Sequence, residues 1–145
     1  MWSTEPAANQ IGVITPSGTI TEYPVPTPSS QPFGIAGPFP NSAVWFTERN
    51  AGKIALMTST GAVTEYPLSS PSSQPGFIAT VVNNGPNSVA NNVLCFTEEA
   101  GNKLGQITTT GVIGEFAVPT ADSTPMLLRA RITNIFGSPK PRATS

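Results

Sequence analysis

Carboxylates are the side chains with which this 145-residue chain could do chemistry, because it contains no histidine and a single cysteine. Without histidine, the chain cannot assemble a Ser-His-Asp or Cys-His nucleophile system, or a histidine-ligated zinc, copper or iron site. The adjacent pair Glu98 and Glu99 is the one chemical hint, since carboxylates at a strand end can bind Mg²⁺ or Ca²⁺ through oxygen. Strand neighbours point to opposite faces, so the two would share one ion only with distortion.

A repeat places these carboxylates in a larger pattern. The segment 2–5 (Trp-Ser-Thr-Glu) returns as 45–48 (Trp-Phe-Thr-Glu) and as 95–98 (Cys-Phe-Thr-Glu), after intervals of 43 and then 50 residues. The same intervals relate five columns: Trp2, Trp45 and Cys95; Glu5, Glu48 and Glu98; Gly18, Gly61 and Gly111; Tyr23, Tyr66 and Phe116; and Glu22, Glu65 and Glu115. So many columns with one pair of intervals indicate three copies of one structural unit.

Each column has a structural interpretation that competes with a chemical one. The glycines follow small polar residues, as in hairpin turns, and the Trp2 column is expected to pack between units rather than to form a stacking platform for a ligand. Glutamates that recur in every unit more often pair between strands than do chemistry, here with Lys53 and Lys103. We therefore favour a structural role for Glu98 and keep Glu99 as the candidate metal ligand.

Short apolar or β-branched runs separated by turns make up each unit. In the middle unit they cover residues 33–36, 43–47, 53–58 and 62–68, which is four strands in an interval of 43 residues. A four-stranded antiparallel unit of this length is typical of a β-propeller blade. The sequence therefore predicts an all-β fold built from propeller blades.

Composition agrees with a turn-rich β fold. The 16 prolines and 13 glycines leave few windows of helical length and exclude a helical bundle, while the 38% of hydrophobic residues can form a core. A net charge of −1, without clustered cations in the repeats, argues against nucleic acid as a partner, and no apolar stretch is long enough to span a bilayer. Cys95 is expected to be a small buried hydrophobe. We expect a soluble protein without a visible signal peptide, and its compartment stays unknown.

The repeats fill residues 1–125. We expect a partial blade over 2–32, a blade over 33–75, a blade over 76–125 with an insertion in its loop 82–92, and a candidate closing strand and basic tail over 126–145. Three blades are too few for a closed propeller, which uses roughly 4 to 8. The expected architecture is therefore a partial propeller, completed by the remainder of a longer polypeptide or by a second copy, since a homodimer supplies six blades.

Three strings of the sequence carry a resemblance to a known family. Residues 14–24 (ITPSGTITEYP), 30–35 (SQPFGI) and 45–48 (WFTE) resemble the streptogramin B lyase (virginiamycin B lyase) family, and the likeness extends over residues 1 to about 125. The resemblance implies a seven-bladed propeller of about twice this length. It also implies a carbon–oxygen lyase that confers antibiotic resistance by opening cyclic depsipeptides through elimination across the ester, with a histidine base and carboxylate-bound magnesium.

The resemblance places the histidine base of the family at positions that cannot supply one. Phe33, Gly76 and Met126 stand there, and none of these side chains titrates. An elimination needs a base whose pKa lies near the working pH. We therefore assign no catalytic residue, and whether the chain belongs to an enzyme stays open.

The acidic positions of the family are also mostly replaced. Gln31 and Gln74 stand where the resemblance places a carboxylate beside the base, and Arg49 occupies the magnesium-binding position in one unit. Glu99 alone retains a carboxylate at that position. We expect no cofactor, with Mg²⁺ implied by the resemblance only.

Three hypotheses for function remain. In the first, the chain is a non-catalytic repeat scaffold or binding module, or a fragment of a longer protein. In the second, it is part of a true lyase, and other blades supply the base, which a second identical copy cannot do. In the third, the central pocket of an assembled ring binds a small molecule, a carbohydrate or a peptide.

Overall fold

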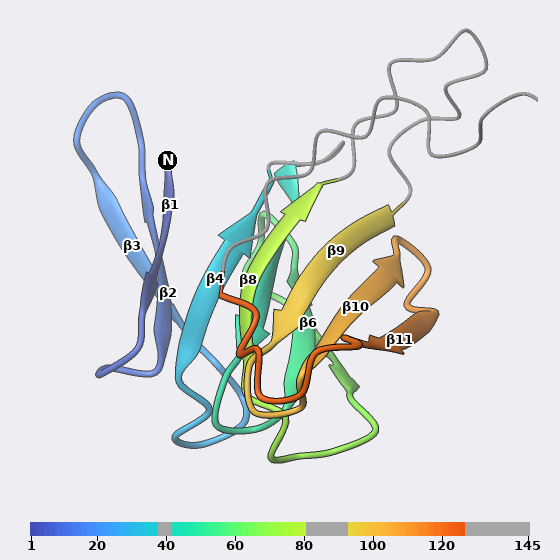
Figure 1. Cartoon of the computed structure of the whole chain (residues 1–145). Coiled ribbons are helices and arrows are strands. Elements are labelled where there is room, and N and C mark those ends of the chain that lie inside the picture. Colours follow the sequence, from blue (N-terminus) through green and yellow to red (C-terminus); the bar gives the residue numbers. More distant parts are fainter. Residues whose placement is uncertain (38–41, 81–92, 127–145) are drawn as a thin grey trace, which may run out of the picture.

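The computed structural model describes residues 1–37, 42–80 and 93–126, which form strands and turns (Figure 1). The strands are β1 (Trp2–Glu5), β2 (Gln10–Ile14), β3 (Ile20–Pro24), β4 (Pro32–Ala36), β5 (Val44–Glu48), β6 (Lys53–Met57), β7 (Val63–Pro67), β8 (Pro75–Thr80), β9 (Val93–Glu98), β10 (Lys103–Thr108) and β11 (Ile113–Ala117). None of the described segments is a helix that could cross a membrane. The predicted loop 82–92 and the closing strand and tail beyond Met126 lie outside the described residues.

The strands form three antiparallel sheets of consecutive strands. The first sheet has the order β1-β2-β3, the second β4-β5-β6-β7 and the third β8-β9-β10-β11. The register is shared, because Tyr23 lies opposite Ile11, Tyr66 opposite Ile54 and Phe116 opposite Leu104. The predicted all-β fold of antiparallel propeller repeats, in the form of a partial propeller, is therefore confirmed.

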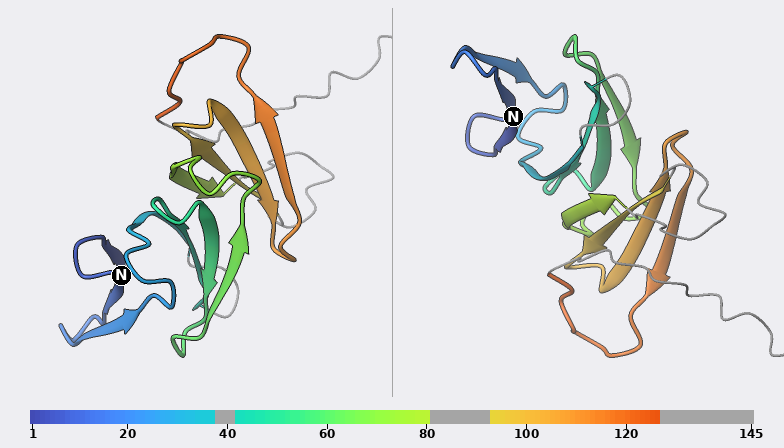
Figure 2. Two further views of the ribbon diagram at one scale, coloured as in Figure 1. Left: turned by 90° about the horizontal axis from the view of Figure 1, so that it is seen from below. Right: turned by 90° about the horizontal axis from the view of Figure 1, so that it is seen from above.

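The three sheets stand side by side in chain order, like neighbouring blades of a fan (Figure 2). Their first strands form the inner side of the fan, where β4 and β8 are in contact. The two backbones lie close together at Gly34, where an added Cβ would overlap the carbonyl oxygen of Gly76. Side chains at the ends of these inner strands are therefore placed to meet across the junction between sheets.

Two apolar clusters fill the spaces between the sheets. Ile11, Val25, Val44, Phe46, Ala55 and Met57 form the cluster between the first and second sheets, and Trp45, Ile54, Leu68, Ile78, Leu94, Phe96 and Ile107 form the cluster between the second and third. Because successive strand residues point to opposite faces, Trp45 and Phe46 enter different clusters. The second sheet is thus covered on both faces, and every residue of β5 is buried.

The repeated glycines lie in the hairpins between the third and fourth strand positions. Gly18, Gly61 and Gly111 have φ angles of 87°, 85° and 90°. Glycine takes this conformation without the steric cost that a Cβ adds. These turns fix the register in which the outermost strand of each sheet presents its glutamate.

Candidate functional site

Two of the repeated glutamates are buried without a hydrogen-bond partner among the described residues. Glu48 and Glu98, called the inner glutamates below, end β5 and β9 and have 0% exposure. No described residue donates a hydrogen bond to either carboxyl group. Burial, followed by the nearby Glu65, raises the pKa of Glu48 to about 7, and burial, followed by the nearby Glu115, raises the pKa of Glu98 to about 7. Both acids are therefore neutral in mildly acidic solution, the form that burial favours.

The other repeated glutamates are paired. Glu65 accepts hydrogen bonds from Lys53 Nζ at 2.6 Å and from the Thr27 hydroxyl and backbone N–H at 2.8 and 3.1 Å. Burial raises the pKa of Glu65, but the hydrogen bonds from Lys53 and Thr27 outweigh it and hold the pKa below its ordinary value. Because Thr27 follows the first sheet and Glu65 lies on the second, this carboxylate links two sheets.

Glu115 repeats that arrangement at the next junction. It accepts hydrogen bonds from the Ser69 hydroxyl at 2.8 Å and from Lys103 Nζ at 3.4 Å. Burial raises its pKa, but the hydrogen bond from Ser69 and the neighbouring groups outweigh this and lower it. Glu65 and Glu115, called the outer glutamates below, are therefore the ones that pair with the lysines considered above. Glu22 of the same column is exposed, and Gln10 stands in the lysine position beside it.

At two of the positions where the resemblance places the base, threonines of the preceding sheet donate hydrogen bonds to the backbone. Thr4 Oγ1 donates to the carbonyl oxygen of Phe33 at 2.9 Å, and Thr47 Oγ1 donates to that of Gly76 at 2.7 Å. The third position, Met126, is exposed at 61%. The carbonyl groups of Phe33 and Gly76 therefore accept hydrogen bonds that link neighbouring sheets.

Glu99 is neutralised by an arginine from the neighbouring sheet. The Arg49 guanidinium forms an ion pair with the Glu99 carboxylate, and its carbon lies 4.9 Å from the centre of the Phe33 ring. Phe33 also meets Phe77 edge-on, with ring centres 5.7 Å apart. Arg49 therefore contacts both Glu99, the predicted metal ligand, and Phe33, which stands where the resemblance places the base.

This arrangement does not fit a magnesium site. Mg²⁺ needs near-octahedral oxygen ligands, whereas Glu99 already binds a guanidinium. No cluster of three His, Cys, Asp or Glu side chains exists within the described ranges. The adjacent Glu98 offers no help, because its carboxyl lies near Ser73 and Glu115, away from Arg49.

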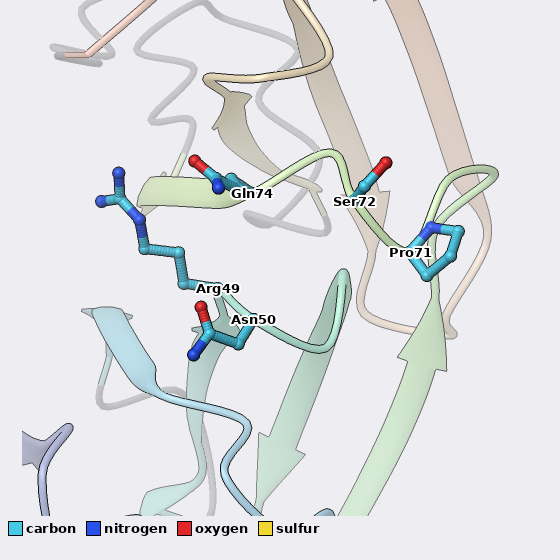
Figure 3. A pocket seen from close by; sticks show the side chains of 5 residues that line it. All are labelled: Arg49, Asn50, Pro71, Ser72 and Gln74. Atoms are coloured by element: carbon cyan, nitrogen blue, oxygen red, sulfur yellow. The ribbon is translucent and has the colours of Figure 1, made fainter.

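A pocket of about 330 Å³ opens beside Arg49 (Figure 3). Arg49 and Asn50, from the turn after β5, and Pro71, Ser72 and Gln74, from the connector between β7 and β8, line it. Its side chains offer amide and hydroxyl donors and acceptors and one paired cation. The five residues that line the pocket include no side chain able to act as a general base near neutral pH.

The aromatic column lies against the core. Trp45 is 1% exposed and stacks on Tyr66 with ring centres 5.4 Å apart, and Trp2 stacks on Tyr23 at 6.5 Å. Cys95 is half-buried, and burial raises the pKa of its thiol. Glu5, the counterpart of the inner glutamates in the first sheet, is also half-buried.

An asparagine column that our sequence reasoning missed holds the connectors between sheets. Asn9 Nδ2 donates to the carbonyl oxygen of Thr27 at 2.9 Å, and its Oδ1 accepts from the Ser30 hydroxyl at 3.0 Å. Asn102 repeats these contacts with Thr120 and Ser123, at 2.9 and 2.6 Å. The intervals of 43 and 50 residues would have revealed the column.

The middle member of that column is Gly52. An added Cβ at Gly52 would overlap the backbone of Pro71, so the connector passes where an asparagine side chain would stand. Ser73, the counterpart of Ser30, is 1% exposed, and its hydroxyl has no hydrogen-bond partner among the described residues. The connector that lines the pocket therefore differs from the other two.

Comparisons with known proteins agree with the fold of repeated antiparallel sheets. The model of the virginiamycin B lyase family matches residues 1–133. A solved streptogramin B lyase is 38% identical, with a TM-score of 0.77, and the match covers 86% of this chain and 39% of that one. A virginiamycin B lyase from Staphylococcus aureus is 44% identical, with a TM-score of 0.76 and coverage of 86% and 40%.

A further solved structure is a catalytically inactive histidine-to-alanine variant of virginiamycin B lyase from Staphylococcus aureus, with quinupristin. It is 43% identical and has a TM-score of 0.75, and the match covers 85% of this chain and 39% of that one. None of the curated proteins matches the chain. The chain thus spans about two fifths of the length of these solved relatives.

Proposed function

Because this chain belongs to the virginiamycin B lyase family, we propose that its three sheets serve as a non-catalytic scaffold or binding module within a propeller that further blades complete. The further blades come from a second copy or from the remainder of a longer propeller. The absence of histidine carries the proposal, since Phe33, Gly76 and Met126 stand where the family has its base. The inactive histidine variant among the solved relatives supports the need for that side chain in the lyase itself.

The contacts of Arg49 support the same proposal. This side chain joins Glu99 to the Phe33 ring and so occupies the carboxylate that a magnesium ion would need. The pocket beside it presents polar groups that suit binding without chemistry. We propose that a peptide or another small polar molecule is the ligand, held through the Asn50 and Gln74 amides.

Incubation with quinupristin tests the absence of catalysis. Ring opening by elimination leaves the mass of the substrate unchanged, so the product must be separated by chromatography and identified by fragmentation. We expect no opened product from the chain with or without Mg²⁺, while a complete lyase converts the substrate under the same conditions. Opened product from the purified chain contradicts the proposal.

A ligand panel tests the binding role. Quinupristin, short peptides and oligosaccharides are titrated while the thermal unfolding temperature is recorded. We expect a saturable rise for a ligand of the pocket and its loss in Gln74→Ala, whose side chain lines the pocket. An unfolding temperature that no ligand of the panel changes contradicts the role as a binding module. The role as a scaffold then remains.

The second candidate is a lyase whose base comes from other blades. The identities of 38–44% to solved lyases favour it. A second identical copy cannot supply the histidine, so the base must come from a different segment. Turnover on mixing with a histidine-bearing segment of the family, and none from either part alone, would establish this candidate.

A further inference from the structure

Arg49 and Glu99 are counterparts in the repeat, and each lies over the residue of its own sheet that stands where the resemblance places the base. The guanidinium carbon of Arg49 lies 4.9 Å from the centre of the Phe33 ring. The carboxylate of Glu99 lies against Gly76, where an added Cβ would overlap Oε1 and come within 3.2 Å of Cδ. An aromatic ring thus supports the arginine, whereas the carboxylate occupies the space that a glycine leaves open.

The backbone of Gly76 does not require a glycine. Its φ angle lies outside the left-handed region, so an alanine can adopt the same conformation. The atoms nearest to an added Cβ belong to the side chains of Glu99 and Thr97, with Thr97 Oγ1 at 3.1 Å, and none of these three atoms belongs to the backbone. The absence of a side chain at position 76 therefore serves the Glu99 carboxylate rather than a turn.

Glu99 is held in this space by two contacts. Its backbone N–H donates to the carbonyl oxygen of Gln74 at 3.1 Å. Its carboxylate forms the ion pair with Arg49, in which Nη1 donates to Oε1 at 3.5 Å and Nη2 donates to Oε2. The two side chains are only 25% and 10% exposed for Arg49 and Glu99, so salt screens this pair less than a surface pair. Arg49 therefore reaches the pocket with its charge neutralised.

This neutralisation bears on what the pocket can hold. Of the five residues that line it, Arg49 alone carries a charge. A free guanidinium binds carboxylates through two parallel hydrogen bonds. Glu99 already supplies two acceptor oxygens, and its negative charge repels a second carboxylate nearby. The amides of Asn50 and Gln74 are then the groups of the lining that suit a neutral ligand (Figure 3).

We propose that Gly76 sets the charge selectivity of the pocket: it leaves room for the Glu99 carboxylate to occupy Arg49, so the pocket accepts neutral polar groups and rejects carboxylates. Glu99 acts as a built-in competitor for any ligand carboxylate. A peptide ligand therefore presents an internal amide rather than its carboxyl terminus. This selectivity rests on the proposed function in one respect, that the pocket binds a small polar ligand.

Paired titrations of the 145-residue chain with N-acetylglycine and its neutral analogue N-acetylglycinamide test the selectivity, followed by the Arg49 Nε–Hε signal in NMR at constant ionic strength. We expect the wild type to bind the amide at least as tightly as the acid. Gly76→Ala and Glu99→Gln should each raise the affinity for the acid on the order of tenfold and leave that for the amide within about twofold. Gly114→Ala is the matched control, because its added Cβ would meet nothing closer than 3.3 Å, at the end of the Gln106 side chain.

The Arg49 signal without ligand tests the role of Gly76 by itself. Displacement of the carboxylate in Gly76→Ala should move this signal toward its position in Glu99→Gln, whereas Gly114→Ala keeps the wild-type position. Circular dichroism establishes that each variant is folded, and Glu99→Gln tests the competition with Gly76 in place. An unmoved signal in folded Gly76→Ala, or a wild type that binds the acid as tightly as Glu99→Gln does, overturns the selectivity alone. An amide that does not bind the wild type overturns the proposed ligand as well.

Discussion

The inner and outer glutamates differ in environment although both recur with the same intervals. The carboxyl groups of Glu48 and Glu98 are fully buried and accept no hydrogen bond from described residues, and their pKa values rise to about 7. Glu65 and Glu115 accept hydrogen bonds from a lysine and from a connector hydroxyl, and their pKa values fall below the ordinary value. The comparison teaches that recurrence identifies a structural position, while the donors within reach decide the charge that it carries.

The lysines make this difference. Lys53 lies opposite Glu48 in the sheet register, yet its ammonium donates to Glu65 on the next strand and to the Thr27 hydroxyl, at 2.6 and 2.7 Å. The outer glutamate therefore takes the cation at the junction between sheets. The inner one is left buried without a hydrogen-bond donor among the described residues, and there the protonated form avoids the cost of burying a charge.

The largest expected effect is on the pH dependence of stability. An inner glutamate whose pKa rises from 4.5 to about 7 on folding stabilises the fold fully below pH 4.5, and loses this contribution as the pH rises through 7. The loss amounts to about 3 kcal/mol for each carboxyl. The outer glutamates act in the opposite direction, because their contribution is present above pH 4.5 and is lost as the pH falls through their lowered pKa.

Urea unfolding monitored by tryptophan fluorescence between pH 3 and 9 measures this profile. We expect the free energy of unfolding to be greatest near pH 5, where the outer glutamates are ionised and the inner ones neutral. Stability should fall on both sides of this maximum. A free energy that increases from pH 5 to 8 would contradict the burial of neutral acids at Glu48 and Glu98.

The second effect concerns Glu98 on the third sheet alone, so it is about half as large as the combined effect of the two inner glutamates. Glu98→Gln keeps the shape of the side chain but cannot ionise. The variant should therefore not show the decrease of about 3 kcal/mol in the free energy of unfolding that this carboxyl causes between pH 5 and 8. We expect a small change at pH 5 and a clear stabilisation at pH 8 in the same urea experiment. Glu22→Gln, at an exposed glutamate, is the control and should keep the wild-type profile. An unchanged slope in Glu98→Gln would show that Glu98 is ionised in the folded chain.

The third effect has the opposite sign and concerns the outer glutamates. Glu65→Gln retains an oxygen for Thr27 but loses the charged partner of Lys53, so we expect a cost of about 2 kcal/mol at pH 7. The cost should shrink as the pH falls through the lowered pKa of Glu65, because the wild-type carboxylate is then protonated as well. Stability that is equal to wild type at pH 7 would remove the distinction between inner and outer positions.

The sequence alone predicted much of the fold and little of the contacts. Intervals of 43 and 50 residues were enough to place the strands, because hydrophobic alternation and turn glycines repeat in each unit. They could not separate Glu48 from Glu65, since that difference depends on how far the Lys53 side chain reaches across the sheet. The pairing of Arg49 with Glu99 joins residues on different sheets and has no counterpart column from which it could be inferred.

The smallest expected effect concerns the serines beside the inner glutamates. Ser30 donates to Asn9 Oδ1, whereas the equally buried Ser73 has lost this acceptor because Gly52 stands in the asparagine column. Ser30→Ala should therefore cost about 1 kcal/mol in urea unfolding, and Ser73→Ala should stay within about 0.5 kcal/mol of wild type. Equal costs for the two variants would show that the Ser73 hydroxyl has a partner, and Glu98 is the group beside it. In that case Ser73→Ala should also raise the pKa of Glu98 further, and the decline in stability above pH 5 would become steeper.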